Sequence, residues 1–142
     1  ASCKMHKPHG SRLKEHYCRR WITIYLLKDF FEESSKERLF GAQISQMGDS
    51  SERYLCLSVA RKSNLRSKTN SCLTVGLLVN DNSREKIKFI DDPKLSQKVV
   101  GQTCERCEIS DCTERVAPAT IFKAKERKRK RKEELNNIFE SL

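Results

Sequence analysis

Three cysteines within nine residues are the feature of this chain with the most specific chemistry. Cys104, Cys107 and Cys112 are spaced C-x2-C-x4-C in the segment GQTCERCEISDCTER, residues 101–115. A C-x2-C pair can turn two thiolates toward one point, and a third thiolate five residues later can close the same pocket. Thiolates bind zinc and iron–sulfur clusters. The spacing therefore predicts a metal or cluster site, and the alternative is a metal-free turn of buried cysteines.

Three thiolates are one ligand short of a closed four-ligand site, so another residue must join them or one position stays open. Cys18 is the distant candidate, although it would serve equally well as a small buried residue at the start of a helix. Asp111 is a second candidate, although an aspartate there also suits a turn or a helix cap. A zinc ribbon would normally show a second C-x2-C pair or a Cys–His pair, and an iron–sulfur cluster tolerates an irregular fourth ligand. The spacing thus favours the cluster, with zinc as the alternative.

Apolar periodicity predicts one helix and four strands that would position this motif. Residues 18–33 place apolar and aromatic side chains at steps of three and four, which predicts an amphipathic helix with its Trp face inward. The stripe consists of Trp21, Ile24, Tyr25, Leu27 and Phe31. Alternating patterns predict four strands within residues 40–45, 54–60, 72–79 and 86–90, with turns at 48–52 and 80–85. Short connections favour an antiparallel meander with the helix on one face, which is an α+β fold.

Positive charge is distributed over the whole chain of 142 residues. The net charge is +10, of which residues 123–142 contribute +4 and the remainder +6. A basic surface suits a polyanionic partner such as nucleic acid or a phosphate-bearing ligand. The loop at residues 61–70 could bind phosphate groups or be an ordinary basic surface loop. Its cations are Arg61, Lys62, Arg66 and Lys68.

The composition of the last segment, residues 119–142, predicts a basic terminal helix exposed to solvent. Such a helix could contact nucleic acid, or it could dock on a second copy of the chain and form a homodimer.

No run of eighteen apolar residues exists, which argues against a membrane span. The start of the chain has neither a signal-peptide layout nor a methionine, so we expect a cytoplasmic piece of a longer protein. No nucleophile motif, glycine-rich phosphate loop or HExxH is present, and we expect no enzyme activity.

Three blocks in this order and spacing resemble a known family. They are CRRW at residues 18–21, VGLLVNDNSREKIKFIDDP at residues 75–93 and VVGQTCERCEISDCTERVAP at residues 99–118. Together they resemble the C-terminal domain of the short-chain fatty acyl transcriptional regulators of bacteria. In those proteins an XRE-type helix-turn-helix module binds DNA and precedes this domain.

The resemblance implies a GAF-like sensor domain that binds a short-chain acyl-CoA and can carry a four-iron iron–sulfur cluster. Cys104, Cys107 and Cys112 match the family's cysteine motif, and Cys18 matches the cysteine of its C-x-R-W block. We therefore expect a polar segment at residues 1–17, a sensor domain at 18–118 and a basic helix at 119–142. The predicted function is ligand sensing for a transcriptional regulator whose DNA-binding module lies outside this chain. The alternative is a zinc-stabilised nucleic-acid-binding module.

Overall fold

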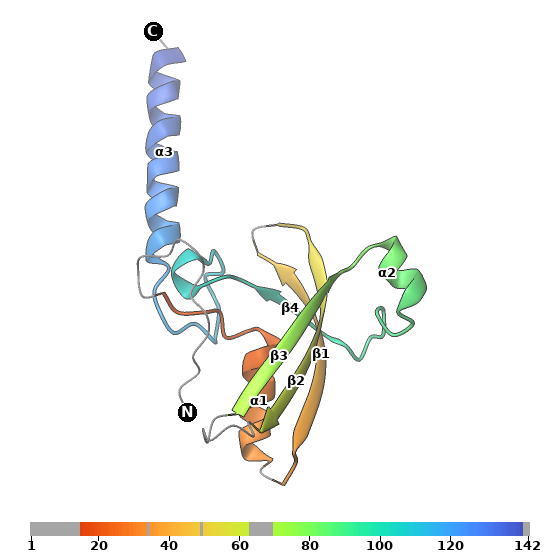
Figure 1. Ribbon diagram of the computed structural model, residues 1–142. Coiled ribbons are helices and arrows are strands. Elements are labelled where there is room, and N and C mark those ends of the chain that lie inside the picture. Colours follow the sequence, from red (N-terminus) through yellow and green to blue (C-terminus); the bar gives the residue numbers. More distant parts are fainter. Residues whose placement is uncertain (1–14, 34, 49, 63–69, 141–142) are drawn as a thin grey trace. The chain divides into compact units, whose positions relative to one another are not determined.

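The computed structural model describes residues 15–33, 35–48, 50–62 and 70–140, as Figure 1 shows. The chain forms two compact units. The first unit is Arg19–Val100, and the second combines Ala1–Cys18 with Gly101–Leu142. The segment boundaries predicted after residues 17 and 118 stay predictions.

A four-stranded sheet forms the centre of the first unit, with strand order β3-β2-β1-β4 (Figure 1). The strands are β1 (Arg38–Met47), β2 (Arg53–Lys62), β3 (Asn70–Leu78) and β4 (Ser96–Val100). The pairs β1–β2 and β2–β3 are antiparallel, which confirms the three predicted strands with alternating apolar residues. The pair β1–β4 is parallel, so the expected fully antiparallel meander is wrong at its last strand. The fold class is α+β, and the GAF-like comparison stays a prediction.

The strand predicted at residues 86–90 is replaced by a helix and turns. Asn80 starts helix α2 (Asp81–Lys86) through a capping box, in which its side chain accepts from the Ser83 N–H and its own N–H donates to Ser83 Oγ. The segment then turns, because the Ile90 N–H donates to the Ile87 carbonyl. Local hydrogen bonds of Asn and Ser therefore override the short alternation that predicted a strand.

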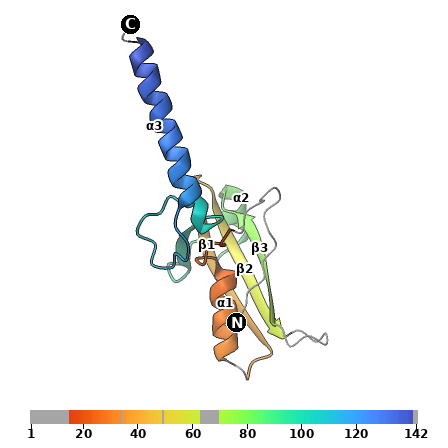
Figure 2. The same ribbon diagram turned by 90° about the vertical axis from the view of Figure 1, so that its left-hand side faces the viewer.

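Helix α1 (Ile22–Glu32) is shorter than predicted and is buried on a different stripe. Its buried residues are Ile22, Leu26 and Phe30, whereas Phe31 of the predicted stripe is 52% exposed. The buried stripe of the helix is thus shifted by about one residue from the predicted stripe, and the expectation that the Trp face points inward is wrong. Residue 18 also lies outside the helix, because the Cys18 N–H donates to the Gln102 carbonyl. Figure 2 shows α1 along one face of the sheet.

Two small apolar clusters hold the first unit together, one on each face of the sheet. On the α1 face, Leu26 and Phe30 pack with Ala60 of β2, and Leu27, Leu39 and Cys72 surround them. On the other face, Ile44 and Leu55 pack with Ile90, surrounded by Leu57, Val79, Ile87 and Leu95. The segment after α2 therefore supplies the core of this second face. Ile87 and Ile90 therefore pack in the core although their segment forms no strand.

Polar side chains are buried between the sheet and α1, and they are hydrogen-bonded to one another. Gln43 Nε2 donates to Ser45 Oγ at 2.9 Å, and the hydroxyls of Ser58 and Thr74 lie 2.7 Å apart. Burial raises the pKa of the nearby Cys56 thiol, which a hydrogen bond with Ser45 only partly opposes. Because buried polar groups need partners, these pairs fix how β1, β2 and β3 align under the helix. Cys56 is therefore a core residue of the first unit.

The second unit contains a short 3-10 turn, η1 (Cys104–Arg106), and the long helix α3 (Thr120–Glu140). The basic terminal helix predicted at residues 119–142 is therefore confirmed over Thr120–Glu140. No side chain of α3 is buried among the residues that the structure describes. Residues 101–118, between β4 and α3, form the cysteine-containing loop.

Candidate functional site: the cysteine loop and the open sheet face

The cysteine motif forms a folded loop in the second unit. Cys104 is buried, Cys107 and Cys112 are half-buried, and all three are free thiols. Gly101 lets the loop fold back closely, because a Cβ at this position would lie 3.3 Å from Cys107 Sγ. A side chain at residue 101 would therefore push Cys107 outward.

Arg115 organises this loop from within the same segment. Its Nη1 donates to the carbonyl oxygen of Cys104 at 2.7 Å, and its Nη2 donates to that of Cys107 at 3.2 Å. Nη2 also donates to the Ile109 carbonyl, and Nη1 approaches the Ala117 carbonyl at 3.4 Å. A guanidinium has five donors in a planar fork, so one side chain can satisfy several carbonyls of an irregular loop. The loop is thus built around a cation of the chain itself.

A short backbone pairing brings residues from the start of the described chain to the loop. The Cys18 N–H donates to the Gln102 carbonyl at 3.2 Å, and the Cys104 N–H donates to the His16 carbonyl at 2.8 Å. The residues between these two bonds form an antiparallel bridge. Since alternate residues of paired strands point to opposite sides, Cys18 and Cys104 face the same side. The structure therefore places the predicted distant cysteine on the same side of this pairing as one member of the motif.

A buried carboxylate anchors the same pairing. The side chain of Glu15 is 3% exposed, and it accepts from Thr103 Oγ1 at 2.6 Å. It also accepts two hydrogen bonds from the Arg106 guanidinium, each 2.7 Å long. The hydrogen bonds with Glu15 raise the pKa of Arg106 above its ordinary value. A buried charge needs such a complete set of partners, because an unpaired carboxylate in this position would be strongly destabilising.

His16 and Glu105 form a second polar pair next to it. His16 Nδ1 lies 2.7 Å from one oxygen of the Glu105 carboxylate, and the His16 N–H donates to the other at 3.0 Å. Burial alone would raise the pKa of Glu105, but the hydrogen bonds from His16 outweigh it and leave this pKa lowered. Sequence reasoning missed both pairs, because their partners are about ninety positions apart and no local pattern links them.

The four cysteines assigned to a metal are not gathered around one point. Within the described residues, no group of three or more His, Cys, Asp or Glu side chains is arranged to hold a metal ion. Cys18 and Cys104 share one side of the backbone pairing, but the sulfurs of Cys107 and Cys112 do not complete a site with them. In this conformation the cysteines do not fit a zinc ion or an iron–sulfur cluster. The metal site stays a prediction.

The first unit carries an apolar surface on its sheet, on the face opposite α1. Residues 87–95 cover only the end of this face near Ile44 and Leu55. At the other end Phe40 is 71% exposed, Leu73 67% and Val75 52%. The cross-strand register places five side chains together as the open face: Phe40, Leu57, Val59, Leu73 and Val75. Contiguous exposed apolar surface of this kind marks binding sites.

Two arginines bound the open face at one end. Arg38 of β1 and Arg61 of β2 are direct cross-strand partners, two residues along from the Phe40–Val59 pair and therefore on the same face. Both are exposed. Neither forms an ion pair with an acidic side chain in the part of the chain that the structure describes. Like charges placed directly opposite each other are destabilising, so this pair is a natural position for an anion.

The predicted phosphate-binding residues divide into three cases. Arg61 lies at the edge of the open face, as just described. Lys62, its neighbour in β2, points to the α1 side of the sheet, because successive strand residues alternate. Arg66 and Lys68 lie outside the described residues. Arg38 was missed, although the alternation that links it to Phe40 in the sequence could have identified it.

Among the described residues, no helix is both long enough and apolar enough to cross a membrane.

Comparison with curated proteins and comparison with solved structures both find no match. A family model described as short-chain fatty acyl coenzyme A regulator, C-terminal, matches residues 13–135. This range includes the cysteine loop, the open face and the arginine pair. The chain therefore belongs to the family of C-terminal domains of short-chain fatty acyl coenzyme A regulators.

Proposed function

We propose that this chain is the effector-sensing domain of a bacterial transcriptional regulator, and that its effector is a short-chain acyl-CoA bound on the open face. The observation that carries the proposal is the Arg38–Arg61 pair at the end of an exposed apolar surface. An acyl-CoA has the same two-part character, with polyanionic phosphates at one end and an apolar acyl chain at the other. The family description supports this choice of effector.

The phosphate end of the effector interacts with the two arginines. The cross-strand pairing holds Arg38 and Arg61 side by side. A phosphate group removes their mutual repulsion and accepts charge-assisted hydrogen bonds from both guanidinium groups. Hydrogen bonds to charged groups contribute about 1.5–3 kcal/mol each, so either arginine should change affinity by roughly tenfold or more.

The acyl end lies against the apolar side chains of the open face. Phe40, Leu73 and Val75 are more than half exposed, and an acyl chain would remove part of their surface from water. Each buried methylene contributes about 0.8 kcal/mol, which corresponds to about fourfold in affinity. Affinity should therefore rise from acetyl- to propionyl- to butyryl-CoA.

Regulation requires that the effector binds one state of the domain better than another. Covering the open face changes the surface that the domain presents, and this change would be passed to the DNA-binding module of the full regulator. The chain itself carries out no chemistry on the acyl-CoA in this proposal, consistent with a family of regulators. The sensor would act by binding alone.

Isothermal titration calorimetry of the whole chain with free CoA, acetyl-, propionyl- and butyryl-CoA tests the proposal. We expect binding that strengthens with acyl length and weakens about tenfold or more in Arg38→Gln and in Arg61→Gln. Arg84→Gln is the matched control, because Arg84 is an exposed arginine of the same unit that is already paired with Asp91. If no CoA thioester binds, the proposed function is wrong. If binding is unchanged in both variants, the position of the site is wrong.

A further inference from the structure

Helix α3 concentrates more positive charge than any other element of the described chain. Residues 123–132 contain eight Lys or Arg and a single Glu, a net charge of +7 over ten residues. The helix has no fully buried side chain, and its charged residues 123–132 are exposed except for Glu126, so packing contributes little to this stretch. A helix without a buried face depends on its own propensity and on charge interactions along its surface.

Among the described residues, the acidic side chains of α3 form ion pairs with only one of these cations. Arg129 donates to Glu126 at 3.1 Å through Nη2 and to Glu133 at 2.5 Å through Nη1. These hydrogen bonds raise the pKa of Arg129 and lower that of Glu126. The other seven cations form no ion pair with an acidic side chain among the residues that the structure describes, although the charge of Lys130 also helps to lower the pKa of Glu126. These seven are Lys123, Lys125, Arg127, Lys128, Lys130, Arg131 and Lys132.

Several of these seven cations repel one another along the helix. Lys123, Arg127 and Arg131 follow at steps of four, and so do Lys128 and Lys132, which places like charges on neighbouring turns. Each such pair destabilises a helix by roughly 0.2–0.5 kcal/mol. A polyanion aligned with the helix would convert this repulsion into attraction. The arrangement is therefore stabilised by binding a partner of opposite charge.

We propose that α3 is a binding surface for the phosphate backbone of duplex DNA. Ten helical residues span about 15 Å, so residues 123–132 carry roughly one net positive charge per 2 Å. Duplex DNA carries one negative charge per about 1.7 Å of its axis. The two charge densities match closely. This surface would contact phosphates and not bases, so it would not recognise a DNA sequence. It would add affinity to the DNA-binding module of the full regulator, which would select the sequence.

A membrane surface fits this helix less well than DNA does. A helix that lies on a membrane needs an apolar stripe along its length. The exposed apolar residues of α3 are instead confined to its last two turns, at Leu135, Ile138 and Phe139. The charged stretch at residues 123–132 contains Ala124 as its one apolar residue, and the apolar residues before it are limited to Ile121 and Phe122 in the first turn.

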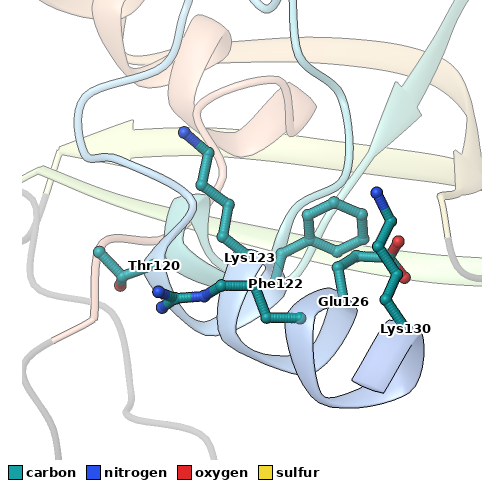
Figure 3. Close-up of a pocket in the computed structure, with 6 residues that line it drawn as sticks. Thr120, Phe122, Lys123, Glu126 and Lys130 are labelled. Atoms are coloured by element: carbon teal, nitrogen blue, oxygen red, sulfur yellow. The ribbon is translucent and has the colours of Figure 1, made fainter. Parts of the chain in front are cut away.

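The first turns of α3 contain a shallow hollow that would seat a sugar–phosphate unit. Its volume is about 470 Å³. Figure 3 shows the side chains of Lys123 and Lys130 extending on either side of the Phe122 ring. Amines on both sides of an apolar ring suit a sugar flanked by two phosphates. The hollow is lined by Thr120, Phe122, Lys123, Glu126, Arg127 and Lys130.

Fluorescence anisotropy of the whole chain with a labelled 20-base-pair duplex, over a series of salt concentrations, tests the inference. The test variant is Lys128→Gln/Arg131→Gln/Lys132→Gln, which keeps good helix formers and removes three unpaired cations. The logarithm of the binding constant falls with the logarithm of salt by about 0.9 per neutralised phosphate. We expect the slope to become shallower by roughly 2–3 in this variant, with at least tenfold weaker binding at low salt.

The matched control is Arg19→Gln/Lys88→Gln/Lys94→Gln, which removes the same charge from three exposed positions of the first unit. We expect this control to retain most of the affinity and slope. Equal losses in the two variants would show that general positive charge, and not α3, attracts DNA. No salt-dependent DNA binding, or binding to phosphatidylserine vesicles in its place, would overturn the inference. Acyl-CoA binding should be the same in both variants, so the outcome is independent of the proposed function.

Discussion

Arg115 Nη1 donates to the carbonyl oxygen of Cys104 at 2.7 Å, eleven positions earlier in the chain. The same guanidinium reaches the carbonyls of Cys107 and Ile109, so it spans the cysteine motif from inside. Cys104 is also tied to His16 by its own N–H. The conformation of the loop therefore depends on hydrogen bonds that one arginine supplies.

Replacing Arg115 by Met should release the loop, because at least three carbonyls lose their donor and Met offers none. We expect a loss of about 2–4 kcal/mol in the stability of this segment. Hydrogen exchange measured by mass spectrometry should show faster exchange in peptides covering residues 104–117. Arg131→Met is the control, because Arg131 is exposed on α3, and it should leave exchange in those peptides unchanged. Protection that is the same in wild type and Arg115→Met would contradict the role assigned to Arg115.

The His16–Glu105 pair predicts a pH dependence of stability. Burial would raise the pKa of Glu105, but the hydrogen bonds from His16 lower it overall. A carboxyl group with a lowered folded-state pKa stabilises the fold above its unfolded pKa, about 4.3, and this contribution is lost as the pH falls through the folded value. Urea unfolding across pH 3–7 should show a smaller loss of stability at low pH in Glu105→Gln than in wild type.

An exposed glutamate of the same loop provides the comparison for that experiment. Glu108→Gln should follow the wild-type pH profile, because Glu108 is exposed and makes no hydrogen bond through its side chain among the described residues. If Glu105→Gln and wild type lose stability in parallel as the pH falls, then the ionised Glu105 is not a stabilising group.

Two glycines of the sheet should respond differently to the same substitution. A Cβ at Gly41 would lie 3.0 Å from Leu26 Cδ1 and 3.1 Å from Ile22 Cδ1, so α1 must shift slightly or its side chains must repack. We expect Gly41→Ala to lower the free energy of unfolding by about 1–3 kcal/mol. Gly76→Ala meets nothing closer than 3.9 Å and should be neutral or stabilising by up to about 1 kcal/mol. Chemical denaturation of both variants measures this, and an equal effect would contradict the packing of α1 over β1.

The metal prediction has a separate test on protein prepared without oxygen. If the cysteines bind a metal, the melting temperature should fall when a strong chelator is added, whereas a loop that only the hydrogen bonds of Arg115 hold should keep its melting temperature. An iron–sulfur cluster would also give a visible absorption band. A coloured protein with bound iron, or a fall in melting temperature with the chelator, would show that the cysteines rearrange around a metal. In that case, a loss of bound metal in Cys18→Ser would identify Cys18 as a ligand.

Where side chains alternate over a long stretch, the sequence predicts the fold well. β1, β2 and β3 contain nine or ten residues each, and in each strand three apolar residues alternate on the face opposite α1, and all three strands are present. Residues 86–90 have only two alternating apolar residues, and the capping box of Asn80 and Ser83 turns the preceding chain into α2. The five residues of β4 were missed because only the last two are apolar.

The candidate sites depend on partners that a linear pattern cannot supply. The cysteine spacing identified the loop, but the hydrogen bonds that shape it come from Arg115 and from residues 15–18, far away in sequence. In the same way, the basic loop pointed to Arg61, while the register between β1 and β2 adds Arg38. Spacing thus indicated which residues matter, and the backbone pairings decide which of them meet.

The position of the acyl chain on the open face can be measured directly by methyl NMR on protein labelled at Leu and Val methyl groups. Titration with butyryl-CoA should shift the methyl signals of Leu57, Val59, Leu73 and Val75, with a midpoint equal to the calorimetric Kd. The methyl signals of Leu26, which packs on the α1 side of the sheet, should stay in place. Shifts at Leu26 with none on the open face, or no shifts at saturating butyryl-CoA, would contradict the account.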